Sequence, residues 1–463
     1  MAIISDEDII AAPGTPLGYA AIGIIRLSGS GAVELAEGLF QPQLQGLKLT
    51  RAPERVMNLG HICGASDEPL DEVLVVVMRG PHSYTRQDVV EIHCHGGLVA
   101  MSRILERTLR AGARMAEPGE FTRRAWLNGR LDLAQAEAVI DLIRARSGDG
   151  MDQALRQLDG SLSSLVRELR EQLRMLMAEV EADIDFPEEM SDQDGHLLGQ
   201  ALPVLLSSVE ELLQTAKYGR IYREGLAVVL LGKPNTGKST LLNSLLGTER
   251  ALVTEIPGTT RDLIEEAVSI RGIPLRLIDT AGIRGQAGVV ESLGIDRAKT
   301  AVAQADLVLA VFDAGKPIEP EDQTVLQLIA KQDSLLLLNK IDLKQRLLSK
   351  EQLAMLAPGH SVLEISAKLG KGKSELEQAV VDLVGGGIAA AAPAMITRAR
   401  HQNALQRVRN ALNDAEGGLE DGATMDCIAV DLWEAWAALG EILGDAVPEE
   451  IIDTIFKEFC IGK

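Results

Sequence analysis

A glycine-rich loop after a short apolar strand has the residue types and spacing of a phosphate-binding site. The loop is Gly232–Ser239, which reads G-x-x-x-x-G-K-S, and it follows the apolar run Leu226–Leu231. The glycines let backbone N–H groups converge on phosphate oxygens, and the helix predicted to begin at Lys238 adds the positive end of its dipole. The Lys238 ammonium would reach the β and γ phosphates, and the Ser239 hydroxyl would bind Mg²⁺. The motif predicts a nucleoside triphosphate site without distinguishing ATP from GTP.

Two later segments indicate that the base is guanine. Leu335–Leu338 leads into Asn339–Asp342, and the Asp342 carboxylate can accept from the guanine N1–H and exocyclic amine together. Adenine lacks this donor pair, and a site built around a buried acceptor rejects such a ligand by about 10⁴-fold or more. Ser366–Lys368 follows another strand and fits the loop that contacts the guanine O6. The order and strand context of these segments favour GTP.

Segments between these motifs are predicted to respond to the γ-phosphate. Asp279 follows the strand Leu275–Ile278 and is placed to hold Mg²⁺ through water, and the Gly282 N–H can contact the γ-phosphate. The polar loop Thr254–Asp262 is typical of a switch segment, in which Thr260 would complete the Mg²⁺ shell. The predicted GTP-binding residues are Asn235, Thr236, Gly237, Lys238, Ser239, Thr240, Thr254, Thr259, Thr260, Asp279, Thr280, Ala281, Gly282, Asn339, Lys340, Asp342, Ser366, Ala367 and Lys368.

The residue that orients the attacking water is not in its usual place. Many GTPases carry Gln directly after the D-x-x-G motif, but Ile283 stands there and cannot do this. Glu291 is the best local candidate, and the alternative is that it is a solvated acid in the first turn of a helix. Transition-state charge on the phosphoryl oxygens also needs a cation. Arg284, Arg261 or a bound monovalent cation could supply it.

The first 120 residues are predicted to form a small α+β domain. Ala20–Leu27, Val73–Met78 and Asp88–His93 are β-branched or apolar runs bounded by Gly, Pro and Ser, which indicates strands. Gly97–Gly112 is predicted to be a helix.

Helical periodicity dominates the next segment, 121–220. The leucines from Leu155 to Leu176, together with Val180, are spaced by threes and fours, which predicts one amphipathic helix in a bundle core. A coiled-coil seam for a partner is the alternative.

Residues 221–384 alternate strands and helices as a mostly parallel sheet would, and helical signals resume in 385–463. Gly385–Pro393 is predicted to be a linker. The later helices are expected at Ala399–Leu412, Asp426–Leu443 and Pro448–Phe459. Domains whose termini lie close together tolerate insertion into another domain. We therefore predict a multidomain α/β protein with an N-terminal α+β domain, a helical-bundle domain split in sequence and an inserted Ras-like P-loop GTPase domain.

Composition narrows the function classes. The formal net charge of −21 argues against a general nucleic-acid binder, because phosphate affinity comes largely from Lys and Arg. Four scattered cysteines without a Cys-x-x-Cys pair indicate neither a zinc site nor a disulfide framework. Strand alternation would point Cys94 away from His93 and His95, so no metal cluster is predicted there. No signal peptide and no run of about 18 apolar residues is seen, so we expect a cytoplasmic protein without a membrane segment.

On these motifs and several further segments, the chain resembles the MnmE (TrmE) family of tRNA modification GTPases over essentially its whole length. Many translation-related GTPases share the nucleotide motifs, whereas Leu131–Ala138 and the terminal Phe459–Lys463 are far more specific. The other segments that carry the resemblance are Gly258–Asp262, Asp279–Gly282, Pro118–Thr122 and Asp185–Pro187.

The resemblance implies a source for the missing cation. The family homodimerises through its N-terminal domain, and its GTPase domains dimerise with each other when K⁺ and GTP are bound. K⁺ then takes the place of an arginine finger. By match, Asn235, Thr254, Ile256 and Thr259 would ligate K⁺, and Glu291 would orient the attacking water.

The resemblance also implies a second site. The N-terminal domain would bind a tetrahydrofolate derivative (5-formyl or 5,10-methylene) that carries a one-carbon unit. By match, the residues in contact with it are Arg26, Glu91, Arg130 and the terminal Lys463. Cations there suit the glutamyl carboxylates of a folate, and otherwise both arginines would be ordinary surface residues. Cys460 stands at the family's terminal cysteine, with a possible nucleophilic or redox role.

The implied partner is a protein of the MnmG (GidA) family, which carries FAD and forms a hetero-oligomer with the family's members. Together they modify C5 of the wobble uridine of tRNA and install an aminomethyl-type group. The alternative is a GTPase switch in ribosome assembly without tRNA-modifying chemistry. Such a protein would need a basic RNA-binding appendage such as a KH domain, and the sequence shows none. The basic runs at Arg103–Arg114, Arg123–Arg130 and Arg398–Arg409 could face tRNA or be solvated helix faces.

Overall fold

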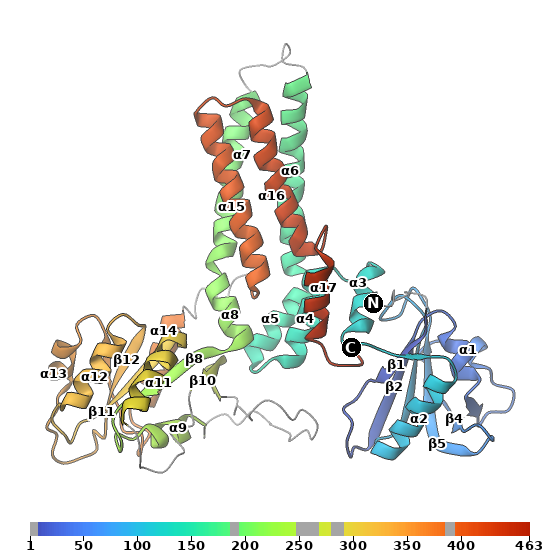
Figure 1. Ribbon diagram of the computed structural model, residues 1–463, viewed down its shortest axis with the longest axis horizontal. Coiled ribbons are helices and arrows are strands. Elements are labelled where there is room, and N and C mark those ends of the chain that lie inside the picture. Colours follow the sequence, from blue (N-terminus) through green and yellow to red (C-terminus); the bar gives the residue numbers. More distant parts are fainter. Residues whose placement is uncertain (1–7, 186–193, 247–267, 279–290, 385–393) are drawn as a thin grey trace.

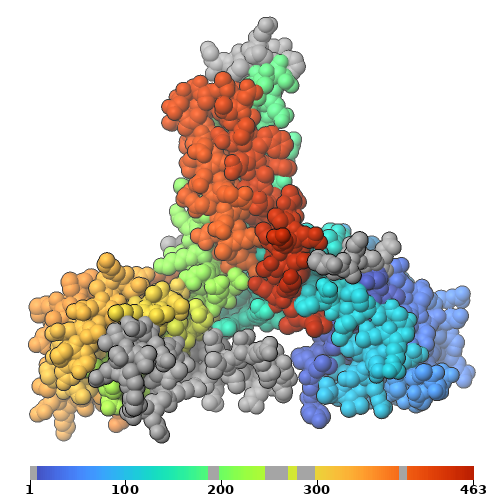
Figure 2. Space-filling model, in the orientation of Figure 1, coloured from blue at the N-terminus to red at the C-terminus, as the bar shows by residue number. Residues whose placement is uncertain are grey.

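The computed structural model describes residues 8–185, 194–246, 268–278, 291–384 and 394–463. An upright helical bundle stands between two α/β parts, which lie on opposite sides of its base (Figure 1). The space-filling view shows the same three parts (Figure 2). This arrangement confirms the predicted fold class.

A seven-stranded sheet forms the N-terminal part, in the order β3-β4-β5-β6-β2-β1-β7. Its strands are β1 (Ile10–Pro13), β2 (Ile22–Ser28), β3 (Phe40–Pro42), β4 (Asn58–Cys63), β5 (Pro69–Met78), β6 (Val89–His95) and β7 (Arg114–Met115). The helices are α1 (Ala32–Glu37), the 3-10 turn η1 (Leu49–Arg51) and α2 (Leu98–Arg110). The predicted strands correspond to β2, β5 and β6, and the predicted helix corresponds to α2. The sequence did not predict β1, β3, β4 and β7.

The pairing of β2 with β6 sets up one of the candidate sites. These strands are antiparallel, and Arg26 lies directly opposite Glu91. The neighbouring residues Ile25, Val90 and Ile92 enter the hydrophobic core. Because side chains alternate along a strand, Arg26 and Glu91 share the opposite face of the sheet.

The helical part combines segments from both ends of the chain. Its helices are α3 (Glu120–Leu127), α4 (Leu133–Arg144), α5 (Gly148–Leu158), α6 (Ser161–Asp185), α7 (Asp194–Gln214), α8 (Ala216–Glu224), α15 (Ala399–Glu420), α16 (Met425–Leu443) and α17 (Glu449–Lys457). One apolar core contains residues of α6 and α7 together with residues of α15 and α16. Helices that precede the inserted domain in the sequence and helices that follow it therefore share one core, as expected for a helical domain that is split in sequence.

The prediction of one continuous helix through Leu155 and Val180 is wrong. Leu155 and Leu158 belong to α5, and the later leucines belong to α6. The chain turns at Gly160, whose φ of +91° is a left-handed conformation that favours glycine. The Gln135 side chain donates to the Leu158 carbonyl at 2.9 Å, which satisfies an otherwise unpaired carbonyl at the end of α5. The predicted linker Gly385–Pro393 lies outside the described residues.

The inserted domain contains a six-stranded sheet in the order β13-β12-β11-β8-β10-β9. The strands are β8 (Leu226–Leu231), β9 (Val268–Ile270), β10 (Ile273–Leu277), β11 (Leu307–Asp313), β12 (Ser334–Asn339) and β13 (Ser361–Glu364). The helices are α9 (Lys238–Leu246), α11 (Glu291–Gln304), α12 (Pro320–Ile329), α13 (Lys350–Leu356) and α14 (Lys373–Val384). Alternate residues of β11 enter two different cores, so helices cover both faces of the sheet.

Among the described helices, none combines the length and apolar character that a membrane span requires.

Candidate functional site

The predicted phosphate loop lies at the carboxyl end of β8, in the centre of the parallel sheet. Gly232 and Gly237 have φ values of +141° and +102°, and Asn235 has a φ of +65°. A Cβ added to Gly237 would lie 2.2 Å from the Asn339 side-chain nitrogen, so only glycine fits there. The loop then enters α9 at Lys238, as the motif predicts. This backbone can present several N–H groups and a helix N-terminus to an anion.

The Lys238 ammonium lies inside this loop. Its Nζ donates to the carbonyl oxygens of Gly232 and Lys233, each at 2.6 Å. Burial lowers the pKa of Lys238, and a phosphate beside it would favour the charged form again. Ser239 and Thr240 follow in the exposed first turn of α9, where a hydroxyl oxygen suits Mg²⁺.

Asn339 fastens the base-binding loops to the phosphate loop. Its Nδ2 donates to the Thr236 carbonyl at 2.8 Å, and its Oδ1 accepts from the Ala367 N–H at 3.0 Å. The Lys340 Nζ donates to the Asn235 carbonyl at 2.6 Å. Three segments far apart in the sequence are thus joined at one edge of the sheet.

The predicted guanine acceptor is also held in place. Ser366 Oγ donates to Asp342 Oδ1 at 2.6 Å. That hydrogen bond lowers the pKa of Asp342, so the carboxylate is ionised and ready to accept. Lys368 is exposed beside this loop.

Asp313 belongs to this site, although the sequence motifs did not point to it. The Lys340 Nζ lies 2.6 Å from Asp313 Oδ2, and this ion pair holds Lys340 at the carboxyl edge of the sheet. A signal was present, because Asp313 ends the buried apolar run of β11 at the carboxyl edge of the sheet. Polar residues at that edge are the ones that ligands meet.

Several predicted site residues lie outside the described residues. They are Thr254, Ile256, Thr259, Thr260, Asp279, Thr280, Ala281 and Gly282. Glu291 is the first residue of α11, and its side chain is not among those described. The roles of these residues in Mg²⁺ binding, K⁺ binding and hydrolysis remain predictions.

A second cluster forms where the C-terminal tail meets the N-terminal sheet. Arg26 Nε donates to Glu91 Oε1 at 2.9 Å, and Arg26 Nη1 donates to the Gly462 carbonyl at 3.0 Å. Gly462 has a φ of +97°, and an added Cβ would lie 2.0 Å from the Pro13 carbonyl oxygen. The tail therefore lies directly on β1 and β2, and it brings Lys463 to the predicted folate-binding residues.

Tyr84 joins the remaining predicted residue to this cluster. The Arg130 guanidinium lies 4.6 Å from the centre of the Tyr84 ring, and Arg26 lies 6.0 Å from it. Burial lowers the pKa of Lys463, and the nearby Arg26 charge lowers it further. An anionic ligand would relieve that repulsion, so three cations beside an aromatic ring suit an aromatic molecule with carboxylates. No local signal in the sequence pointed to Tyr84.

Cys460 is exposed in the same tail. Its carbonyl accepts from the Gly119 N–H at 3.4 Å, which ties the tail to the start of α3. Its thiol is therefore accessible to a ligand or partner at this edge of the N-terminal domain.

The side chains of His93, Cys94 and His95 have separate partners. Cys94 is buried, its Sγ donates to the Gly23 carbonyl at 3.4 Å, and burial raises its pKa to about 11. His93 lies 3.3 Å from Glu91, and His95 lies 2.6 Å from Asp71. The predicted alternation along this strand is confirmed. Within the described part of the chain, no group of three or more His, Cys, Asp or Glu residues is arranged to hold a metal ion.

Comparison with known proteins gives matches to one family along nearly the whole chain. The family model "MnmE helical domain" matches residues 133–460, and "GTP-binding protein TrmE N-terminus" matches residues 9–130. The tRNA modification GTPase MnmE of Geobacillus kaustophilus (strain HTA426) is 46% identical over an alignment of 464 positions, which covers 99% of this chain and 100% of that relative. The protein of the same name from Moorella thermoacetica (strain ATCC 39073 / JCM 9320) is 49% identical over 462 residues, with the same coverage.

Among solved structures, one match is the G domain of the T. maritima FeoB iron transporter, and the matched region covers 34% of this chain and 98% of that chain. The sequence identity is 28%, and the TM-score of 0.26 is too low to support a conclusion.

Proposed function

The chain belongs to the MnmE family of tRNA modification GTPases, and from that premise we propose how its two candidate sites divide the work. It is a GTP hydrolase that acts in tRNA modification. In our proposal, the inserted domain hydrolyses GTP, and the N-terminal domain with the C-terminal tail handles a one-carbon unit. The target is C5 of the wobble uridine. The family relation favours this function over a switch in ribosome assembly.

Hydrolysis in this proposal uses residues of the nucleotide domain. Lys238 and the loop N–H groups bind the β and γ phosphates, and Ser239 and Thr260 hold Mg²⁺. K⁺, when bound by Asn235, Thr254, Ile256 and Thr259, supplies the positive charge that the transition state needs. Glu291 orients the attacking water. The contacts of Asn339 with Thr236 and Ala367 support the proposal, because they hold the guanine and phosphate loops together.

The second part of the proposal concerns the one-carbon donor. Arg26, Arg130 and Lys463 would bind the carboxylates of a tetrahydrofolate derivative, either 5-formyl or 5,10-methylene, and Glu91 would fix Arg26. The observation that supports this is the Arg26–Gly462 hydrogen bond, which brings the chain's last residues onto the N-terminal sheet. Cys460 would serve as a nucleophile or a redox group beside the bound folate.

We further propose a homodimer that works in the cytoplasm with an FAD-carrying partner of the MnmG family. Exposed apolar side chains on the N-terminal domain support self-association, since such patches mark interaction sites. Tyr19, Ile22, Leu98 and Val99 are 102%, 58%, 52% and 67% exposed. They lie near one another, because the Ala20 N–H donates to the Gly96 carbonyl and Ile22 pairs with His95.

GTP hydrolysis in KCl and in NaCl, at equal ionic strength, tests the catalytic part. We expect strong stimulation by K⁺ in the wild type and its loss in Glu291→Ala. Glu321→Ala is the matched control, because Glu321, like Glu291, stands in the first turn of a helix of this domain, and the Glu321 side chain is exposed. Equal rates in both salts would show that the K⁺ ligands are misassigned and that a cation such as Arg284 does this work instead.

Loss of the function in cells provides the second test. A deletion strain should lack the wobble-uridine modification in digested tRNA while its ribosome profile stays normal. A defect in ribosome profiles with intact tRNA modification would support the assembly switch instead.

A further inference from the structure

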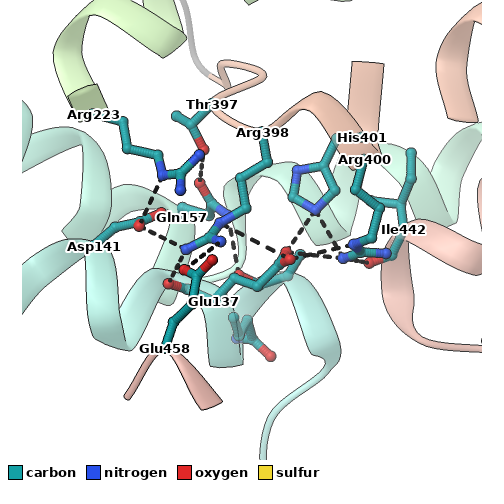
Figure 3. A network of polar contacts seen from close by, with 12 residues as sticks. Glu137, Asp141, Gln157, Arg223, Thr397, Arg398, Arg400, His401, Ile442 and Glu458 are labelled. Carbon is teal, nitrogen blue, oxygen red and sulfur yellow. Dashed lines mark hydrogen bonds and ion pairs between the residues drawn. The ribbon is translucent and has the colours of Figure 1, made fainter. Parts of the chain in front are cut away.

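A group of charged side chains lies where four segments of the chain meet, with buried members at its centre and the exposed Glu458 at one edge (Figure 3). We call it the junction cluster. Its members are Glu137 and Asp141 of α4, Arg223 of α8, Arg398, Arg400 and His401 at the start of α15, and Glu458 at the end of α17. Figure 3 shows two halves, one around the Glu137 carboxylate and one around Asp141.

The Glu137 half is closely packed. Glu137 is 1% exposed, and its Oε2 lies 2.8 Å from both Arg400 Nη2 and His401 Nε2. Burial alone would raise the pKa of Glu137, but the contacts with His401, Arg400 and Arg398 lower it by more. Arg400 also donates to the carbonyls of Glu441 and Ile442 in α16. This half therefore fixes α4 to the bundle.

The Asp141 half links helices that lead to different domains. One oxygen, Asp141 Oδ1, lies 2.7 Å from Arg398 Nη2 and 3.3 Å from Arg223 Nε. The other end of Arg398 faces α17, where its Nη1 lies 3.9 Å from Glu458 Oε2. Arg223, Asp141, Arg398 and Glu458 thus form a continuous chain of ion pairs.

One end of this chain is fixed to the nucleotide domain. Arg223 is close to the start of β8, and β8 leads straight into the phosphate loop. One turn earlier on α8, Arg220 Nη2 donates to Asp306 Oδ1 at 2.6 Å, and Asp306 Oδ2 accepts from the Ala227 N–H at 2.9 Å. A displacement of β8 would therefore move α8 with it.

The other end of the chain reaches the tail site. Glu458 stands two residues before Cys460, and its carbonyl accepts from Arg144 of α4. Beyond it, Gly462 lies against β1 and accepts from Arg26. Arg144 thus makes the hydrogen bond to the residue from which the tail departs, and Arg398 adds an ion pair to the partly exposed carboxylate of the same residue.

Stability alone is a weak explanation for such a cluster. Replacing a buried ion pair by well-packed apolar residues is often neutral or stabilising, so retained charges need another reason. The Asp141 half is also incompletely paired, because Asp141 Oδ2 has no hydrogen-bond partner among the described residues. The same holds for both polar atoms of the Gln153 side chain, which lies beside the cluster. Asp141, Gln153 and Arg223 line one small pocket beside α8. This pocket leaves space for about one water molecule beside Asp141, so the Asp141 half is less tightly packed than the Glu137 half.

We propose that Arg398 is a positioning residue that couples the two candidate sites. It shares Asp141 with Arg223, at the end of the helix α8 that leads into the nucleotide domain, and it forms an ion pair with Glu458. Through these contacts the nucleotide state sets the position of the tail Phe459–Lys463 on the N-terminal sheet. The inference rests on the proposed function in one respect, that the tail completes the one-carbon site.

Amide hydrogen exchange of the segment 455–463 tests the coupling in the full chain. We compare the protein with GDP and with a non-hydrolysable GTP analogue, both in KCl. Couplings between sites typically amount to about fivefold or more, so we expect at least that ratio in the wild type. In Glu458→Gln and in Arg223→Gln the ratio should fall to about one, and the double variant should add nothing further, because both substitutions break one path.

Two further variants separate positioning from folding. Arg398→Lys keeps the charge but cannot bridge Asp141 and Glu458 with a planar fork, so it should also lose the nucleotide dependence. Glu171→Gln removes an exposed pair with Arg174 on α6 and should behave as the wild type. GTP hydrolysis in KCl should stay at the wild-type rate in all of these variants.

The inference is overturned if the tail exchanges equally with both nucleotides in the wild type, or if the variants keep the wild-type ratio. A failure of the proposed function is a separate result, because it appears as equal GTP hydrolysis in KCl and NaCl, whatever the tail does.

Discussion

The nucleotide site and the tail site both bring together residues from distant parts of the chain, but different parts of the structure support them. At the nucleotide site, Asn339 contacts the backbone of Thr236 and Ala367, and every loop leaves the same edge of one sheet. At the tail site, the chain end lies on another domain, held by the contacts of Arg26 and Gly119 with Gly462 and Cys460.

This difference separates a rigid site from an adjustable one. Loops that leave a buried parallel sheet take their positions from its core, so the phosphate loop and the guanine loops, which the structure describes, are in place without a ligand. Chain ends open more easily than a core unless other contacts hold them, and this tail, with its exposed Cys460, depends on a few such contacts. We therefore expect substitutions in the nucleotide site to change nucleotide recognition strongly. Substitutions in the tail site should act by changing the position of the tail on the N-terminal sheet.

The largest effect is expected from Asp342→Asn. The amide would place an N–H where the guanine exocyclic amine needs an acceptor, so the preference for GTP over ATP should fall by about 10³-fold or more. The same N–H can donate to the C2 oxygen of xanthine, so xanthosine triphosphate should bind more tightly to Asp342→Asn than to the wild type. Titrations with fluorescent nucleotides measure both.

Ser366→Ala should give a smaller loss of guanine preference in the same titrations. It removes the hydrogen bond that holds Asp342 and leaves the carboxylate itself, so the loss should be about tenfold, in line with one hydrogen bond to a charged group. Unchanged guanine preference in Asp342→Asn would show that another acceptor reads the base.

Asn339→Ala should destabilise the nucleotide domain by about 2–4 kcal/mol, because it leaves the Thr236 carbonyl and the Ala367 N–H without their buried partner. Hydrogen exchange of β8 and β12 is the suitable measurement, since the three tryptophans, Trp126, Trp433 and Trp436, all lie outside this domain. Ser361→Ala on the exposed end of β13 is the control. Wild-type exchange in Asn339→Ala would mean that the sheet alone holds the loops.

Gly462→Ala should weaken the tail site and leave the nucleotide site intact. The left-handed backbone costs an L-residue about 1–2 kcal/mol, and the clash with the Pro13 carbonyl adds to that. We expect the affinity for 5-formyltetrahydrofolate, measured by calorimetric titration, to fall tenfold or more, with K⁺-dependent GTP hydrolysis unchanged.

Gly112→Ala provides the matched control, because Gly112 is in the same domain, has a φ of +117° and has open space at its Cβ. It carries the backbone strain without displacing the tail. Equal folate affinity in Gly462→Ala and the wild type would contradict a role of the tail in binding.

How far the sequence predicts each site follows from the range of the contacts. The phosphate and guanine residues stand in short motifs next to strands, so their types and spacing are sufficient to indicate them. Arg26 and Gly462 are 436 positions apart, and no local pattern predicts that they meet. Only the family resemblance pointed to Arg26 and Lys463.

Two other features were missed for different reasons. The break between α5 and α6 was missed because the leucine spacing continues across it, although Gly160 was a visible signal. The Asp141–Arg398 pair joins segments separated by the whole inserted domain, and charged residues of an amphipathic helix usually face solvent.

The smallest expected effect concerns His401 in the junction cluster, which belongs to neither site. His401 is fully buried, and burial lowers its pKa. A neutral ring with its proton on Nε2 can donate to Glu137, whereas a charged ring would also place an N–H on Nδ1, which has no partner among the described residues. We therefore infer a neutral His401 in the folded state.

The sign of the pH dependence follows from this state. Below the ordinary His pKa of 6.5 the unfolded chain binds a proton that the folded chain does not, so the free energy of unfolding should fall as the pH drops through that value. The contribution of this residue is at most about 1.4 kcal/mol per pH unit. Urea unfolding followed by tryptophan fluorescence, which reports the helical domain, should show a weaker pH dependence in His401→Gln, whose amide still donates to Glu137 but does not titrate. An identical slope in the variant would place the proton uptake elsewhere and leave His401 charged in the fold.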